Sequence, residues 1–196
     1  MTIAIDPGHG YCNRRPGVYD PGAEEGGVAE ADVALALGLS LSWVLRQRGY
    51  QTWMTRDDDR DPDPVGARDD RAEAAGADVF VSLHCNSAEA ADARGTETYY
   101  RDERDKRLAV WVNNNVAACL RTTNRGIKRE DLSQHSRLAI FDFDGPACLV
   151  ELGFLSNPSE RALLQSVLTS RDARLRLAQA IAAGIDGWRT AWGGAL

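Results

Sequence analysis

The chain has 196 residues, which is about the length of one domain. Hydrophobic residues make up 43% and charged residues 27% of the sequence, and this ordinary composition excludes a disordered chain, a collagen-like repeat and a disulfide-rich miniprotein. The net charge of -6 argues against a nucleic-acid partner, because such proteins usually present a basic face. No apolar run reaches the roughly 18 residues of a membrane span. We therefore expect residues 1–196 to form a single domain that has no membrane-spanning segment.

The first half of the chain alternates apolar runs with stretches of helical periodicity. Residues 28–48 are predicted to be helical because their apolar positions recur every three or four residues. The predicted elements of this half are a strand over 2–6, a loop over 11–27, the helix over 28–48, a strand over 50–55, a loop over 57–64, a short helix over 65–76 and a strand over 78–83.

The second half continues the same alternation. It predicts a strand over 95–100, a helix over 103–121, strands over 138–141 and 147–152, and a helical tail from about 159. Strands that alternate with helices indicate a three-layer α/β fold whose sheet is mostly parallel. We see no internal repeat and no linker, so one domain remains the expectation.

Polar side chains follow the most apolar predicted strands. His9 and His84 come just after two of them, and the strand over 147–150 runs into Glu151. Ligands of open α/β sheets bind at the carboxyl ends of the strands, so these three side chains should meet at one rim. A carboxylate at the end of a buried strand is costly unless it is paired or functional, and an ion pair with an arginine is the alternative for Glu151. The third histidine, His135, lies in a polar loop; we interpret it mainly as solvated, and a substrate contact is the lesser alternative.

Two histidines and a carboxylate are one of the ligand sets of catalytic zinc, in which a fourth position stays open. Possible carboxylates are Glu24, Glu25 and Glu30, with Asp20 and Asp6 less favoured. Glu30 opens the predicted helix, where an acidic side chain is also favoured by the helix dipole alone. The spacing leaves this choice open.

The four cysteines, Cys12, Cys85, Cys119 and Cys148, contain no CxxC pair and are expected to be small buried hydrophobes. Cys85 follows His84 directly, but neighbouring residues of a strand point to opposite faces. We therefore do not expect Cys85 to be a nucleophile activated by His84.

Seven segments taken together resemble one enzyme family across most of the chain, from Ile3 to about Ile185. They are IAIDPGHG (3–10), the helix start at Glu30, TRDDD (55–59), DVFVSLHCNS (78–87), GTETYY (95–100), NRGIK (124–128) and PACLVELGFLSNPSE (146–160). This set and its order resemble the zinc-dependent N-acetylmuramoyl-L-alanine amidases of the Amidase_3 group, which are cell-wall amidases.

The resemblance implies a mixed, largely parallel sheet of six strands flanked by helices. It also implies one zinc ion held by His9, Glu30 and His84, with Glu151 as the catalytic acid and base. It places Arg125 and Asn86 near the substrate. The loop over 128–137 departs from the family pattern and is a candidate determinant of specificity.

The implied reaction is hydrolysis of the amide between N-acetylmuramic acid and the L-alanine of the stem peptide in peptidoglycan. Two alternatives remain at this point: a zinc peptidase that acts on other amides, and a peptidoglycan-binding domain without turnover. We expect a monomeric catalytic domain with no separate cell-wall-binding module.

No charged segment followed by an apolar segment precedes the first predicted strand, so no secretory signal is visible. Two origins fit this expectation. One is an enzyme made in the cytoplasm that acts on the cell wall, as phage endolysins do. The other is a trimmed domain of a secreted or periplasmic autolysin.

Overall fold

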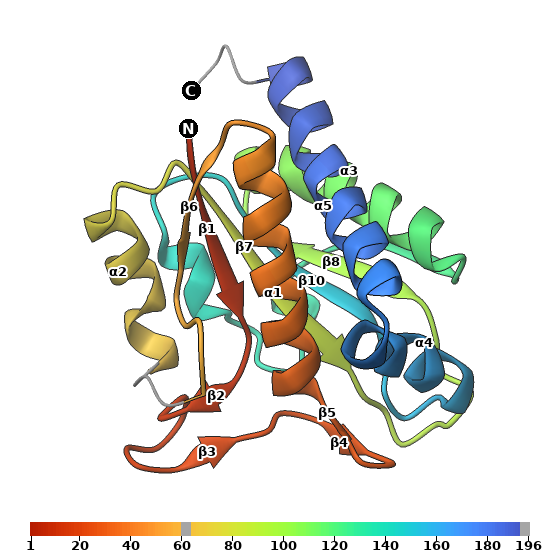
Figure 1. The fold of residues 1–196 in the computed structure, drawn as a ribbon. Helices are drawn as coiled ribbons and strands as arrows, with labels where there is room; N and C mark the ends of the chain where they lie inside the picture. Colours follow the sequence, from red (N-terminus) through yellow and green to blue (C-terminus); the bar gives the residue numbers. More distant parts are fainter. Residues whose placement is uncertain (60–63, 193–196) are drawn as a thin grey trace.

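The structure is a computed structural model that describes residues 1–59 and 64–192. A mixed sheet of six strands forms its centre, in the spatial order β6-β1-β7-β10-β8-β9 (Figure 1). Within this six-stranded sheet, only the β10–β8 pair is antiparallel. The strands are β1 (Thr2–Pro7), β6 (Gln51–Met54), β7 (Val79–Asn86), β8 (Thr96–Tyr100), β9 (Asn124–Arg129) and β10 (Ala147–Phe154).

Helices cover both faces of this sheet. The first face carries α1 (Glu30–Gln47), α3 (Glu103–Leu120), α4 (Pro158–Thr169) and α5 (Arg171–Trp192), which share one buried core with the strands. The second face carries the short helix α2 (Arg68–Ala74) and the 3-10 helix η3 (Ala139–Asp142). The predicted three-layer α/β fold with a mostly parallel six-stranded sheet is therefore confirmed.

The alternation of side chains along β7 explains why both faces are covered. Val79, Val81 and Leu83 enter the larger core under the long helices, whereas Phe80 enters the smaller core. A strand that is buried on both faces reads as a continuous apolar run, as this one does. His84 lies on the same face as Phe80, which directs it away from the larger core.

The prediction of a strand over 138–141 is wrong. Residues 139–142 form η3, and Ile140 and Phe141 are buried in the smaller core instead of pairing with a strand. Arg101 holds this turn by donating to the carbonyl oxygens of Leu138 and Phe141. A run of four apolar residues fits a buried turn as well as a strand, and periodicity does not separate the two.

Other elements differ from the predictions in detail. Strand β9 was not predicted, because its sequence NRGIKR is polar and the strand lies at the sheet edge. The predicted loop over 11–27 is replaced by two small hairpins over residues 10–29, so the helix predicted from residue 28 begins at Glu30. The helical tail is divided into α4 and α5. The hairpin strands are β2 (Gly10–Tyr11), β3 (Tyr19–Asp20), β4 (Glu24–Glu25) and β5 (Val28–Ala29).

The remaining short elements are η1 (Val65–Ala67), which leads into α2, and η2 (Glu130–Leu132). Residues 60–63 of the predicted loop over 57–64 lie outside the described residues. Across residues 1–59 and 64–192, each helix is either too short or too polar to cross a membrane. All four cysteines are free thiols.

Candidate metal centre and active site

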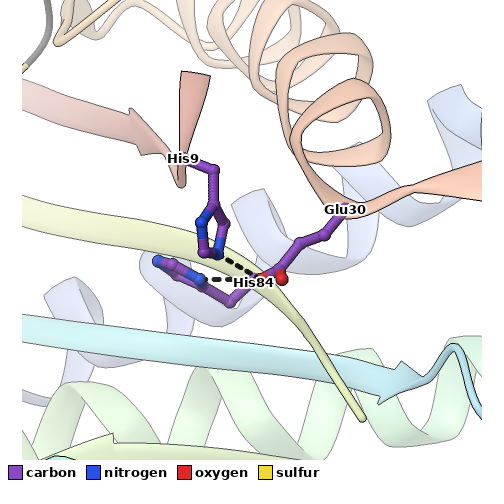
Figure 2. Close-up of side chains that lie close together, drawn as sticks. All are labelled: His9, Glu30 and His84. Carbon is purple, nitrogen blue, oxygen red and sulfur yellow. Dashed lines mark hydrogen bonds and ion pairs between the residues drawn. The ribbon is translucent and has the colours of Figure 1, made fainter. Parts of the chain in front are cut away.

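Three side chains from distant parts of the chain converge at the carboxyl end of the sheet. His9 follows β1, Glu30 is the first residue of α1, and His84 lies within β7, two residues before its end. Glu30 Oε1 is 3.0 Å from His9 Nε2 and 2.8 Å from His84 Nδ1. Figure 2 shows both rings turned toward the Glu30 carboxylate. One donor atom from each residue lies within 4.8 Å of the others, as a shared cation requires.

The other carboxylates considered from the sequence lie elsewhere. Glu24 and Glu25 are exposed in β4. Asp6 is fully buried and pairs with Arg68 at 2.8 Å. Asp20 approaches the opposite nitrogen of His9, Nδ1. Glu30 is the carboxylate that joins both histidines.

The donor set fits zinc. Two imidazoles and one carboxylate are a ligand set of catalytic zinc sites. Gly22 lets the backbone pass close to two of these side chains, because a Cβ there would come within 2.5 Å of Glu30 Oε2 and 2.7 Å of the His9 ring. Burial opposes ionisation of Glu30, but hydrogen bonds and charge from His84 and His9 outweigh it and hold the pKa of Glu30 well below its usual value. Glu30 is therefore a carboxylate, the form that binds metals.

Two buried arginines hold the backbone that carries these ligands. Arg56 donates to the carbonyls of Pro7, Gly8 and Ala31, and so ties the segment before His9 to the start of α1. Arg68 donates to the carbonyl of His9 and to Asp6. His9 has a φ of +63°, a region that non-glycine residues seldom adopt. These contacts stabilise that backbone conformation.

Glu151 lies beside the three candidate ligands. In the pairing of β10 it is opposite His84 on β7 and Glu97 on β8. Its Oε2 is buried and makes no hydrogen bond with any described residue. Burial, reinforced by the charges of Glu30 and Glu97, raises the pKa of Glu151 well above its usual value. The described part of the chain provides no arginine partner, so the ion-pair interpretation of Glu151 finds no support.

A cleft of about 640 Å³ opens in front of these groups. One part of its lining is formed by His9, Asn13, Asp20, Glu30 and His84, which we call the metal wall. Another part is formed by residues 133–135 and 137–140, which we call the loop wall. Glu151 and Asn86 also line the cleft.

His135 is exposed and lines the cleft on the loop wall. It does not belong to the candidate donor set, which is His9, Glu30 and His84. Arg101 pairs with Glu130 and Asp142, which flank the loop wall in the chain, and donates to the Leu138 carbonyl within it. Residues 133–135 and 137 of the loop over 128–137, the candidate determinant of specificity, therefore line the cleft.

The two residues expected near the substrate share one buried partner, Glu97. Asn86 Nδ2 donates to Glu97 Oε1 at 3.1 Å, and Arg125 pairs with Glu97 Oε2. Lys128 reaches the same oxygen at 2.6 Å. Asn86 lines the cleft, whereas Arg125 stacks on Phe154 at 5.0 Å outside it. Sequence reasoning missed Glu97, although it lies within the GTETYY segment.

Cys85 is buried among the residues of the larger core. Burial raises the pKa of its thiol well above the usual value, and the charges of Glu30 and Glu151 add to this effect. A thiol held in its neutral form is a poor nucleophile, which agrees with the expected divergence of Cys85 and His84.

The fold and the site together define a three-layer α/β protein with a candidate His2Glu metal centre and an adjacent free carboxyl group. The family model described as N-acetylmuramoyl-L-alanine amidase matches residues 3–187. The chain belongs to this family of cell-wall hydrolases, and its enzyme class is that of an N-acetylmuramoyl-L-alanine amidase. The resemblance noted in the sequence is confirmed.

Relatives and solved structures agree with this assignment. The chain is 34% identical to the uncharacterized protein YqiI of Bacillus subtilis, over 95% of this chain and 84% of YqiI. It is 31% identical to the B. subtilis N-acetylmuramoyl-L-alanine amidase LytC over 85% of this chain, but spans only 32% of LytC. The catalytic domain of the amidase CwlV of Paenibacillus polymyxa superposes with a TM-score of 0.82 at 32% identity, covering 97% of this chain and 98% of that domain.

Proposed function

We propose that this chain hydrolyses the amide bond between N-acetylmuramic acid and the L-alanine of the stem peptide, with one zinc ion held by His9, Glu30 and His84. The observation that carries the proposal is the position of Glu151, a carboxyl group with an unpaired oxygen beside the candidate ligand His84. Family membership supports the choice of substrate.

When bound in such a site, zinc would act as a Lewis acid that polarises a carbonyl group and lowers the pKa of water to about 7. The chain supplies the proton transfers. Glu151 accepts a proton from the attacking water while a C–O bond forms at the lactyl carbonyl carbon. It then donates that proton to the alanine nitrogen while the C–N bond breaks. The products are a carboxylate on the sugar and a free amino terminus on the peptide.

The environment of Glu151 suits both transfers. A catalytic acid and base works best when its pKa is near the working pH, and an ordinary glutamate ionises well below that range. The raised pKa of Glu151 moves it in the required direction. Its unpaired oxygen faces no competing hydrogen-bond donor among the described residues.

The proposal includes a monomer that acts on the cell wall. All candidate ligands, Glu151 and both walls of the cleft come from one chain, so the site needs no second copy. A dimer detected by light scattering in solution would contradict the proposal that the protein is a monomer.

The histidines offer a matched test of the metal centre. We expect His84→Ala to lose bound zinc and peptide release from purified peptidoglycan, because it removes a ligand. The control His135→Ala changes another histidine that lines the same cleft and should keep one zinc per chain. A chelator should abolish release by the wild type, and added zinc should restore it. Full zinc content and activity in His84→Ala would contradict the proposal.

A further inference from the structure

A carboxylate outside the donor set lies against the far side of His9. Asp20 Oδ2 is 3.2 Å from His9 Nδ1, whereas His9 Nε2 faces Glu30 at 3.0 Å. The imidazole is thus held between two carboxylates, and only Glu30 belongs to the candidate ligands.

Local structure brings Asp20 to this position. The β2–β3 hairpin pairs Asp20 with Gly10, the neighbour of His9. The Gly22 amide donates to Asp20 Oδ1 at 3.0 Å, and Asn13 Nδ2 donates to Asp20 Oδ2 at 2.6 Å. Both carboxylate oxygens are therefore held in place before the contact with His9 is considered.

The Asn13 amide is itself oriented by a buried charge. Arg68 donates to Asn13 Oδ1 at 2.9 Å and to the His9 carbonyl at 2.8 Å. Because the oxygen of Asn13 faces Arg68, its NH2 group must face Asp20. One guanidinium thereby positions the backbone of His9 and, through Asn13, the carboxylate that contacts its ring.

The chemistry of the contact determines where the His9 proton lies. An ionised carboxylate can only accept hydrogen bonds. When His9 Nε2 gives its lone pair to a metal, the ring keeps one proton on Nδ1, and Asp20 is the acceptor that faces this N–H. Ligand histidines commonly donate their other N–H to a carboxylate, which fixes their tautomer and ring orientation. We propose that Asp20 is the positioning residue that holds His9 ready to bind the metal; this rests on the metal centre of the proposed function.

The affinity for zinc measures this role without reference to catalysis. Asp20→Asn keeps the shape of the side chain but removes the obligate acceptor, and we expect zinc to bind about 10–100-fold more weakly. Asp32→Asn is the matched control, because it removes an exposed carboxylate that contacts Tyr19 instead of His9. Its zinc affinity should stay within about twofold of the wild type. Competition with a chromophoric chelator gives all three affinities, and circular dichroism checks folding.

A second measurement needs no variant. The chain has only three histidines, so ¹⁵N NMR of the zinc-loaded protein can identify which nitrogen of each ring carries the proton. We expect His9 to carry its proton on Nδ1. A proton on Nε2, or equal zinc affinity in Asp20→Asn and the wild type, would overturn the inference. If the wild type binds zinc but releases no peptide from peptidoglycan, the proposed function fails while both measurements still decide the role of Asp20.

Discussion

The two walls of the cleft are built in different ways. The metal wall is largely buried, and Arg56 and Arg68 hold its backbone through contacts that join residues 25 to 62 positions apart. The loop wall is mostly exposed between residues 133 and 137, and Arg101 contacts it at the Leu138 carbonyl and pairs with the flanking Glu130. A rigid wall suits a metal centre that needs fixed distances, whereas an exposed wall can vary with the substrate. Chemistry should therefore depend on the first wall and selectivity on the second.

The largest effect is expected at Glu151, which lines the same cleft as the two walls. Glu151→Gln removes the proton acceptor but keeps the side-chain volume, so turnover should fall by about 10²–10⁴-fold. The zinc content should not change, because Glu151 is not a candidate ligand. Metal analysis and peptide release measured on the same preparation separate the two roles. Turnover near that of the wild type would remove Glu151 from the mechanism.

The same substitution at Arg68, which holds the metal wall, and at Arg137 of the loop wall tests the difference in rigidity between the walls. Arg68→Met leaves Asp6 buried without its ion pair, and we expect the free energy of unfolding to fall by about 3–5 kcal/mol. Arg137→Met on the loop wall removes an arginine with 72% side-chain exposure, which should change stability by less than about 1 kcal/mol. Urea unfolding of both variants measures the contrast. Equal losses would show that the two walls are not distinct.

Low pH should destabilise the fold around the metal wall, because Asp6 pairs there with Arg68, which holds the backbone of His9. Burial opposes ionisation of Asp6, but Arg68, Ser82, His84 and Thr55 outweigh it, so the pKa of Asp6 in the folded state is lowered. A carboxyl group whose pKa is lower in the folded state adds stability above its unfolded value of about 4. That contribution is lost as the pH falls through the folded pKa.

We therefore expect the urea midpoint of the wild type to fall below about pH 4. Asp6→Asn should be less stable at neutral pH and should show a shallower fall. If the urea midpoints of Asp6→Asn and the wild type fell equally with pH, Asp6 would not contribute to the acid dependence.

The smallest effect on the chemistry is expected from changes at the loop wall. Arg101→Gln removes the ion pairs with Glu130 and Asp142, which should cost about 1–2 kcal/mol of stability because the group is partly exposed. The Michaelis constant for peptidoglycan fragments should rise, while zinc affinity stays that of the wild type. Steady-state kinetics with zinc titration checks both. Weaker zinc binding would indicate that the walls are coupled.

The sequence predicted the elements that follow simple patterns. Apolar runs and helical periodicity located β1, α1, β7 and α3 to within a few residues. The positions of His9, His84 and Glu151 near strand ends pointed to one rim, and the family resemblance selected Glu30. The structure brings these four residues together.

The parts that sequence reasoning missed depend on long-range contacts. Arg56 and Arg68 lie in charged segments that read as surface, yet both are buried against the first residues of the chain. The sequence offered Asp20 only as a less favoured metal ligand, and its contact with the far nitrogen of His9 became visible in the fold. Glu97 looks like an ordinary acidic residue until the fold places Arg125 beside it. No periodicity in a single sequence encodes such partners.

The nature of the reaction products tests the central claim most directly. A purified disaccharide-peptide fragment of peptidoglycan should be incubated with the zinc-loaded protein and analysed by mass spectrometry. Our account predicts free disaccharide and a peptide whose new amino terminus is L-alanine, in amounts that disappear with chelator and return with zinc. Cleavage within the peptide, or between the two sugars, would contradict it.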